Sequence, residues 1–171
     1  MAKYLANSSG KLTEVHSINV SAGAGDANKI IETDASGKLD VSFLPVGIGA
    51  EVSVMPSSEN LAGGDWLNIY NNTGVANARK ADATTNTKPC DGFTLSAVTS
   101  PANVTVYGLS QKNTAVTGYT VAADYWLGTT AGLAVTTAPS AAGNIVQLLG
   151  KPISATAMIL ENTKFYYTLV A

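Results

Sequence analysis

The chain has 171 residues, of which 46% are hydrophobic and only 13% are charged, and its formal net charge is -2. This length allows one ordinary domain, or a domain with an appended arm, and excludes two large domains. The composition excludes a wholly disordered chain, which would combine low hydrophobicity with high net charge. A single arginine, Arg79, argues against nucleic-acid binding, which needs clustered Lys or Arg.

The scarcity of charge leaves a surface of hydroxyls, amides and small apolar groups, which protects poorly against association. We therefore expect a surface that is meant to associate. No apolar run approaches the roughly 20 residues of a membrane span, and the first ten residues lack the pattern of a secretory signal. Synthesis in the cytosol, with no membrane partner, is the simple expectation.

Residues 1–28 are small, polar and rich in Gly and Ala, with Leu12, Val15, Ile18 and Val20 as spaced apolar residues. They predict an extended arm with room for one short strand. Such a segment has too few apolar groups to offset its own ordering entropy. The arm is therefore expected to be mobile or to be ordered by a partner.

Residues 29–50 predict a small hairpin followed by a linker. Asp34 and Gly37 occupy the positions that a type I turn favours, between the arms 29–33 and 38–41. Pro45 biases the residue before it toward an extended conformation, and residues 46–49 form a hinge or linker. A hairpin of this size is not stable alone, so its apolar residues need the main domain or other subunits. The candidate docking or subunit-interface residues are Ile30, Ile31, Leu39, Phe43 and Leu44.

Residues 51–171 are expected to form a β-sandwich or a β-barrel. Strand-length apolar runs recur between turn signals such as Asn71–Gly74 and Asp91–Gly92, and no helical spacing is sustained. Short strands without intervening helices are typical of an all-β fold. The expected strands are Glu51–Met55, Trp66–Tyr70, Phe93–Val98, Asn103–Leu109, Asn144–Leu149, Ile153–Leu160 and Lys164–Val170.

The sequence offers few groups for catalysis. His16 is the single histidine and lies in the predicted arm, where a precisely held base or metal ligand is not expected. Cys90 precedes a predicted strand and has no histidine nearby to activate it, so we interpret it as a bystander thiol. We therefore expect no enzyme, no catalytic residue, no small-molecule substrate and no cofactor.

The acidic residues are also better explained by structural roles in turns than by metal binding or catalysis. Asp34, Ser36 and Asp40 have the spaced oxygens of a calcium loop, but the terminal bidentate Glu of such a loop is missing, so we favour a turn and expect no metal. Four further aspartates would have to pair to form a glycosidase dyad. Each of them adjoins turn residues, where Asp commonly caps a turn through its own backbone. These four are Asp65, Asp82, Asp91 and Asp124.

The aromatic residues allow two interpretations, a sugar-stacking platform or core and subunit contacts. Aromatic side chains in strands are usually half-buried or paired across strands, which favours the second interpretation. The residues concerned are Trp66, Tyr70, Tyr125, Trp126, Phe165, Tyr166 and Tyr167.

Three stretches resemble a group of tailed-phage virion proteins that act as capsid decoration (cement), head-fibre or tail-fibre proteins. The first runs from Asn28 to Asp40 and on to the Leu44–Gly49 joint, and the second is Asp91–Val98. The third comprises Asp124–Gly132, Thr136–Pro139, Gly143–Gly150 and Ser154–Thr156, which are similar to the closing hairpins of those β-domains.

The resemblance implies a homotrimer on the capsid exterior of the virion, whose N-terminal arm or hairpin contacts the major capsid protein. The hairpin residues above would then lie at the docking site or the trimer interface. Two alternatives remain open. The chain could be a head- or tail-fibre module that recognises host-surface carbohydrate, or, less in keeping with its few acid/base groups, a polysaccharide-degrading enzyme.

Overall fold

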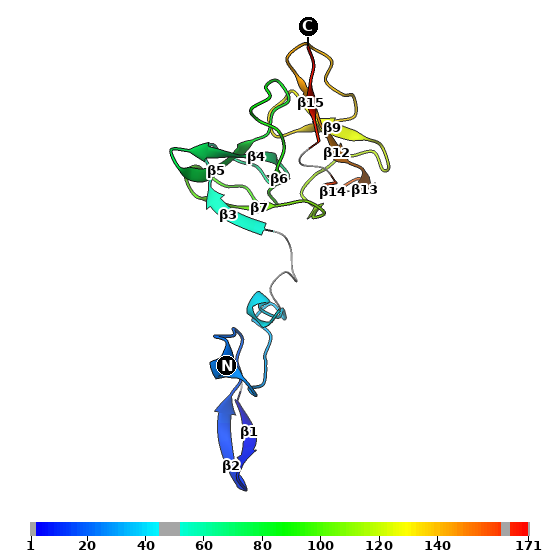
Figure 1. Cartoon of the computed structure of the whole chain (residues 1–171). Coiled ribbons are helices and arrows are strands. Elements are labelled where there is room, and N and C mark those ends of the chain that lie inside the picture. Colours follow the sequence, from blue (N-terminus) through cyan, green and yellow to red (C-terminus); the bar gives the residue numbers. More distant parts are fainter. Residues whose placement is uncertain (1–2, 45–51, 162–164, 171) are drawn as a thin grey trace. The chain divides into compact units, whose positions relative to one another are not determined.

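The computed structural model describes residues 3–44, 52–161 and 165–170, which form two compact units, Met1–Gly49 and Ala50–Ala171. The all-β prediction is confirmed, because the described residues form strands and only two helical turns of three residues each (Figure 1). None of the described sheets closes into a barrel. The predicted domain limits after residues 28 and 50 stay predictions, since a domain is defined by its own core as well as by compactness.

The first unit begins with an antiparallel hairpin of β1 (Lys3–Ser8) and β2 (Lys11–His16). Its two-residue turn has positive φ at both positions, 53° at Ser9 and 82° at Gly10, as the tight hairpin turn that matches strand twist requires. The Gly10 N–H donates to Asn7 Oδ1 across the turn, at 2.9 Å. The sequence predicts an extended arm with one short strand here, and the structure has two strands, because this turn folds the segment back on itself.

The predicted hairpin at residues 29–41 is present only as its turn. The Gly37 N–H donates to the Asp34 carbonyl at 3.0 Å, and the Asp34 carboxylate accepts the N–H groups of Ser36 and Lys38. The ladder expected between the flanking arms is not formed, since Ile31 pairs instead with Ile18 in a parallel bridge. Two short helical turns complete the unit, η1 (Ala24–Asp26) and η2 (Val41–Phe43). The predicted hinge at residues 46–49 lies outside the described residues.

The largest sheet of the second unit has five strands in the order β3-β7-β6-β4-β5, paired antiparallel throughout. Beyond β3, Ser57 makes a parallel bridge to Ala78 of β5, so the two ends of the sheet approach one another and the sheet curls (Figure 1). Its strands are β3 (Val52–Pro56), β4 (Trp66–Asn72), β5 (Val75–Lys80), β6 (Gly92–Phe93) and β7 (Asn103–Tyr107).

Three smaller sheets have the orders β10-β9-β12, β13-β14-β8 and β11-β15. Their strands are β8 (Lys112–Asn113), β9 (Tyr125–Leu127), β10 (Ala134–Val135), β11 (Ile145–Val146), β12 (Leu148–Gly150), β13 (Pro152–Ser154), β14 (Ala157–Ile159) and β15 (Tyr167–Thr168).

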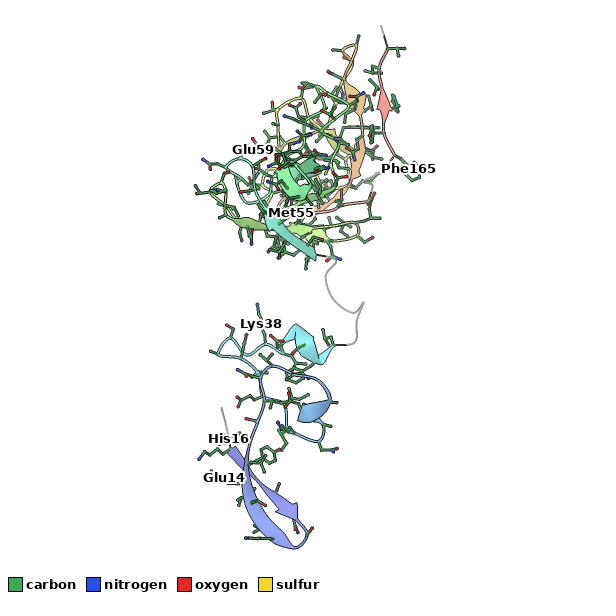
Figure 2. The ribbon with its side chains drawn as sticks, turned by 60° about the vertical axis from the view of Figure 1, so that its left-hand side comes forward. Glu14, His16, Lys38, Met55, Glu59 and Phe165 are labelled. Carbon is green, nitrogen blue, oxygen red and sulfur yellow. The ribbon has the colours of Figure 1, made fainter. Side chains whose placement is uncertain are left out.

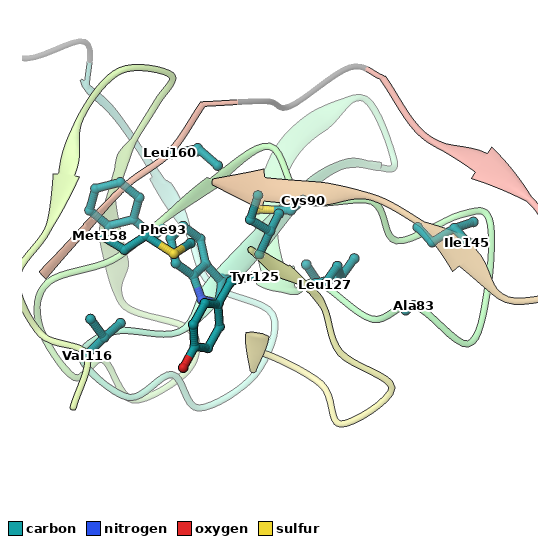
Figure 3. Close-up of a cluster of buried hydrophobic side chains, with 12 residues drawn as sticks. Ala83, Cys90, Phe93, Val116, Tyr125, Leu127, Ile145, Met158 and Leu160 are labelled. Carbon is teal, nitrogen blue, oxygen red and sulfur yellow. The ribbon is translucent and has the colours of Figure 1, made fainter. Parts of the chain in front are cut away.

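Alternation along β4 divides the core in two. The side chain of Leu67 belongs to a small cluster on one face of the curled sheet, with Met55, Leu61, Ala78, Val104 and Val106. Trp66 points to the other face, where its ring meets Phe93 edge to face at 5.5 Å between centroids. There the larger cluster joins the big sheet to the smaller ones (Figure 3): Trp66, Ala81, Ala83, Cys90, Phe93, Val116, Tyr125, Leu127, Ile145, Leu149, Met158 and Leu160.

Three predicted strands differ from the structure. The strand expected at 144–149 is split at Gln147 into β11 and β12, which belong to different sheets. The strand expected at 93–98 ends after Phe93, because the Thr94 hydroxyl bonds to the backbone of Ser96 and turns the chain. The strand expected at 153–160 is a hairpin of β13 and β14, since the Ser154 hydroxyl accepts the Thr156 N–H in a tight turn. Glu51 and Lys164, at the ends of two other predicted strands, lie outside the described residues.

Candidate assembly surfaces

The described residues of the first unit form no apolar core. Of the side chains described between residues 3 and 44, Ser17 alone is buried. Polar contacts hold the unit together instead, with Ser17 Oγ donating to Glu32 Oε2 at 2.6 Å and the Ile30 N–H donating to the Tyr4 hydroxyl at 3.3 Å. Seven of the described large aliphatic side chains are exposed: Leu5, Leu12, Val20, Ile30, Ile31, Leu39 and Leu44.

The predicted docking residues all lie in this unit. Ile30 is 53% exposed and Ile31 47% exposed, while Leu39 and Leu44 are also exposed and Phe43 is half-buried. Adjacent residues of an extended chain point to opposite sides, so the two isoleucines leave apolar surface on both sides of this segment. Exposure makes these residues available to a partner, and their docking role stays a prediction.

The first hairpin carries a second apolar surface, which was not predicted from the sequence. In the register of β1 and β2, Leu5 faces Glu14 and Leu12 faces Asn7, which places both leucines on one face of the hairpin. The Lys3–Glu14 ion pair, at 2.6 Å, lies on the same face. Figure 2 shows Glu14 and His16 on β2, and His16 is exposed there at the end of the strand. The signal was Asn-Ser-Ser-Gly between two short alternating runs, a pattern typical of a tight turn.

Cys90 lies in the larger core cluster with its side chain fully buried. Burial raises the pKa of the Cys90 thiol far above its ordinary value, because the thiolate would lose its hydration. The thiol donates to the Gly92 carbonyl at 3.3 Å. This environment keeps the sulfur protonated and unreactive.

Each of the four aspartates considered for a glycosidase dyad has a structural partner. Asp65, which is buried, accepts the Ala62 N–H at 2.8 Å and pairs with Lys80 at 3.3 Å. Asp91 accepts from Asn68 Nδ2 and the Ile69 N–H. Asp82 caps a turn through Thr84, and Asp124 pairs with Lys151 at the surface.

The residues considered for calcium binding act within turns. Asp40 accepts the Ser42 N–H, and hydrogen bonding from Ser42 holds the pKa of the Asp40 carboxyl below its ordinary value. Among the described residues, no group of three or more His, Cys, Asp or Glu is arranged to hold a metal ion. No helix of the described part is long and apolar enough to cross a membrane.

Two of the candidate stacking aromatics are buried in the core, and two more are partly covered. Trp66 is fully buried and its indole N–H donates to the Tyr119 hydroxyl, while Tyr119 stacks on Tyr125 at 4.3 Å between centroids. The ring of Tyr70 is covered by the Arg79 guanidinium, whose carbon lies 4.2 Å from the ring centroid. Trp126 is half-buried. The interpretation as core therefore holds for Trp66 and Tyr125.

The aromatic residues around the last described strand, β15, are exposed instead of buried. Tyr166 and Tyr167 are exposed beside Phe165, which Figure 2 shows projecting from the side of its unit. The strand β15 is joined to the domain by antiparallel pairing with β11, in which Val146 faces Tyr167. This strand therefore presents aromatic side chains at the surface of the second unit.

The fold places the chain among all-β proteins. No protein-family model matches the sequence. No characterised protein matches it closely enough to count as a relative. Among solved structures, the chain is similar to the N base of head fiber gp8.5 of bacteriophage phi29, with a TM-score of 0.49 and 13% identity, over 70% of this chain and 100% of that chain. A similarity of this size assigns no function to this chain.

Proposed function

We propose that this chain is a non-enzymatic structural protein of a tailed-phage virion, made in the host cytoplasm, which decorates and stabilises the capsid exterior as a homotrimer. The observation that carries the proposal is the first unit, which buries no apolar side chain among its described residues and exposes seven large aliphatic ones. The sequence resemblance to capsid decoration and head-fibre proteins supports the setting.

The energetics favour a partner for the first unit. Fully burying a Leu or Ile side chain contributes roughly 1.5–3 kcal/mol, and several such side chains stay about half exposed here. Covering them on a capsid subunit or on other copies would recover several kcal/mol per chain, which offsets the ordering entropy of the segment. In a trimer the three docking units act together, so avidity adds to the affinity of each.

The two units would then have different functions, docking and display. The first unit, with Ile30, Ile31, Leu39, Phe43 and Leu44, would contact the major capsid protein or the other copies. The second unit has its own core and would be displayed outward. A protein that binds the assembled shell better than its separated parts stabilises the shell by mass action.

Co-sedimentation with capsids that lack the protein tests the proposal. We expect saturable, symmetric occupancy by the full chain, and at least a tenfold loss of affinity for the double variant Ile31→Glu, Leu39→Glu, because charge cannot be buried at an apolar contact. Val121→Glu, at an exposed apolar position of the second unit, is the matched control and should bind normally. Absence of wild-type binding at every stage of capsid maturation would contradict the proposal.

A second candidate function is carbohydrate recognition by a head- or tail-fibre module. The exposed tyrosines of the C-terminal strand favour it, since sugars stack on aromatic rings. A glycan array or a host-cell binding assay separates the two functions. Binding of host envelope that is lost in the variant Tyr167→Ala, without any capsid binding, would establish the second function in place of the first.

A further inference from the structure

We propose that the strand β15 pairs antiparallel with β15 of a second copy of this chain, about a two-fold axis at Thr168. The contact goes beyond the proposed trimer, because a two-fold pairing joins copies two by two and needs no capsid. It rests on three features of the described residues: an open backbone edge, an uncharged strand and a self-complementary sequence.

The outer edge of β15 is open. Thr168 faces Ile145 in the ladder with β11, and the Ile145 N–H donates to Ala83 on the far side of β11, at 2.8 Å. The Ile145–Thr168 pair is therefore the kind that exchanges no hydrogen bonds, and the N–H and C=O of Thr168 point away from β11. Within the described part of the chain, no strand pairs with that edge.

The paired segments themselves carry no charge. Residues 125–150, which include β11, and residues 165–170, which include β15, contain no Asp, Glu, Lys, Arg or His. Natural edge strands are usually guarded by charged side chains or Pro, and this one is guarded by neither. Instead Tyr167 is 59% exposed and Val170 is 90% exposed. An open edge with exposed apolar side chains is a site for adding a strand.

The sequence of this strand is complementary to itself. When two copies run antiparallel about Thr168, Thr168 faces its own copy, Tyr166 faces Val170 and Tyr167 faces Leu169. Because the backbone groups of Thr168 point outward, the central pair can exchange both of its hydrogen bonds. Thr–Thr pairs and aromatic–β-branched pairs such as Tyr166–Val170 are among the favourable cross-strand neighbours, each contributing roughly 0.2–1 kcal/mol.

These features select a second copy over other occupants. A glycan could stack on the tyrosines but could not match a row of outward N–H and C=O groups as a strand does. Anionic glycans and charged peptides would find no opposite charge on the strands β11 and β15 themselves. The same neutral strand on another copy meets no like charge and fits in register.

Disulfide trapping in the full-length protein tests the contact. Residues facing one another in a hydrogen-bonded antiparallel pair have Cα atoms about 5.5 Å apart, which suits a disulfide. Thr168→Cys should therefore form a disulfide-linked dimer on mild oxidation. The native Cys90 does not compete, because it is fully buried. Thr117→Cys, at another exposed threonine, is the control and should cross-link at least about tenfold more slowly.

Sedimentation of the full chain gives an independent test. Thr168→Lys places two like charges opposite each other and should raise the dissociation constant of the two-fold contact at least about tenfold, whereas Thr117→Lys should not. If the proposed trimer exists, the wild type should form pairs of trimers and Thr168→Lys single trimers, so the two proposals fail separately. The β15 contact would be overturned if Thr168→Lys had the same sedimentation mass as the wild type and Thr168→Cys cross-linked no faster than Thr117→Cys. It would also be overturned if Thr168→Lys lost capsid or glycan binding while its self-association stayed unchanged.

Discussion

At the scale of single residues, the core of the second unit contains a side chain that substitutes for a β-strand. Gln147 is fully buried, and its amide forms two hydrogen bonds with the backbone of Cys90. Its Oε1 accepts the Cys90 N–H at 2.7 Å, and its Nε2 donates to the Cys90 carbonyl at 2.9 Å. A buried backbone amide and carbonyl would otherwise have to be satisfied by a neighbouring strand.

The variant Gln147→Met tests this arrangement. Methionine keeps the length of the side chain but leaves the Cys90 N–H and C=O without a partner, and each buried unsatisfied group costs about 1–3 kcal/mol. We expect the free energy of unfolding of the second unit to fall by about 2–5 kcal/mol in chemical denaturation. The control Gln111→Met, at a half-buried position, should change it by less than about 1 kcal/mol. Equal effects of the two substitutions would contradict the role assigned to Gln147.

At the scale of elements, the large sheet depends on a close approach at Gly92 in β6. A Cβ atom there would lie 2.6 Å from the Tyr107 carbonyl oxygen and 2.6 Å from Val106 Cγ1 of the neighbouring strand. The glycine thus lets the short strand β6 fit between β4 and β7 and carry Phe93 into the core. Phe93 then stacks on Tyr107 at 5.5 Å between centroids.

Gly92→Ala should therefore separate β6 from β7. We expect a loss of at least about 2 kcal/mol in the unfolding free energy of the second unit, as overpacking in a closed core typically gives. Gly118→Ala is the control for backbone strain alone, because Gly118 has a φ of 73° but nothing within 4 Å of a Cβ. It should cost about 1 kcal/mol, and a loss from Gly92→Ala no larger than this would contradict the steric role assigned to Gly92.

Much of the second unit could be predicted from the sequence, where apolar residues alternate with polar ones. Such alternation located β3, β4 and β7. The strand β5 escaped because it reads Val-Ala-Asn-Ala-Arg-Lys, with Ala78 as its buried apolar residue. Nothing local marks it as a strand, since its conformation is fixed by pairing with β4 and by the bridge to Ser57.

The candidate assembly surfaces were predicted in part. The composition indicated a surface meant to associate, and Ile30, Ile31, Leu39 and Leu44 are exposed in the structure. The leucine face of the first hairpin was missed, because its register depends on a turn of Ser9 and Gly10 with positive φ at both residues. The open edge of β15 was missed as well, since it depends on which strand pairs with β11. Local sequence patterns do not determine which distant segments pair.

At the scale of the whole molecule, the two units differ in what stabilises them. The second unit has two clusters of buried apolar side chains and a network of paired strands. The first unit has a two-stranded hairpin, two bridging segments and polar contacts. A two-stranded hairpin is marginal in water, and chains of about 40 residues usually need a disulfide, a metal or a partner to fold. The single cysteine lies in the other unit.

Separate expression of residues 1–49 and 50–171 tests this difference. We expect the 50–171 piece to unfold cooperatively, because it contains its own core. The 1–49 piece should show no cooperative transition when dilute, since ordering a residue costs roughly 1–2 kcal/mol of backbone entropy and this piece buries no apolar side chain among its described residues to offset that cost. It should gain structure, seen by circular dichroism, as its concentration rises or when capsids are added. If the 1–49 piece instead unfolded cooperatively, with a midpoint that did not depend on concentration, the unit would be stable alone. Its exposed aliphatic residues would then no longer indicate an assembly surface.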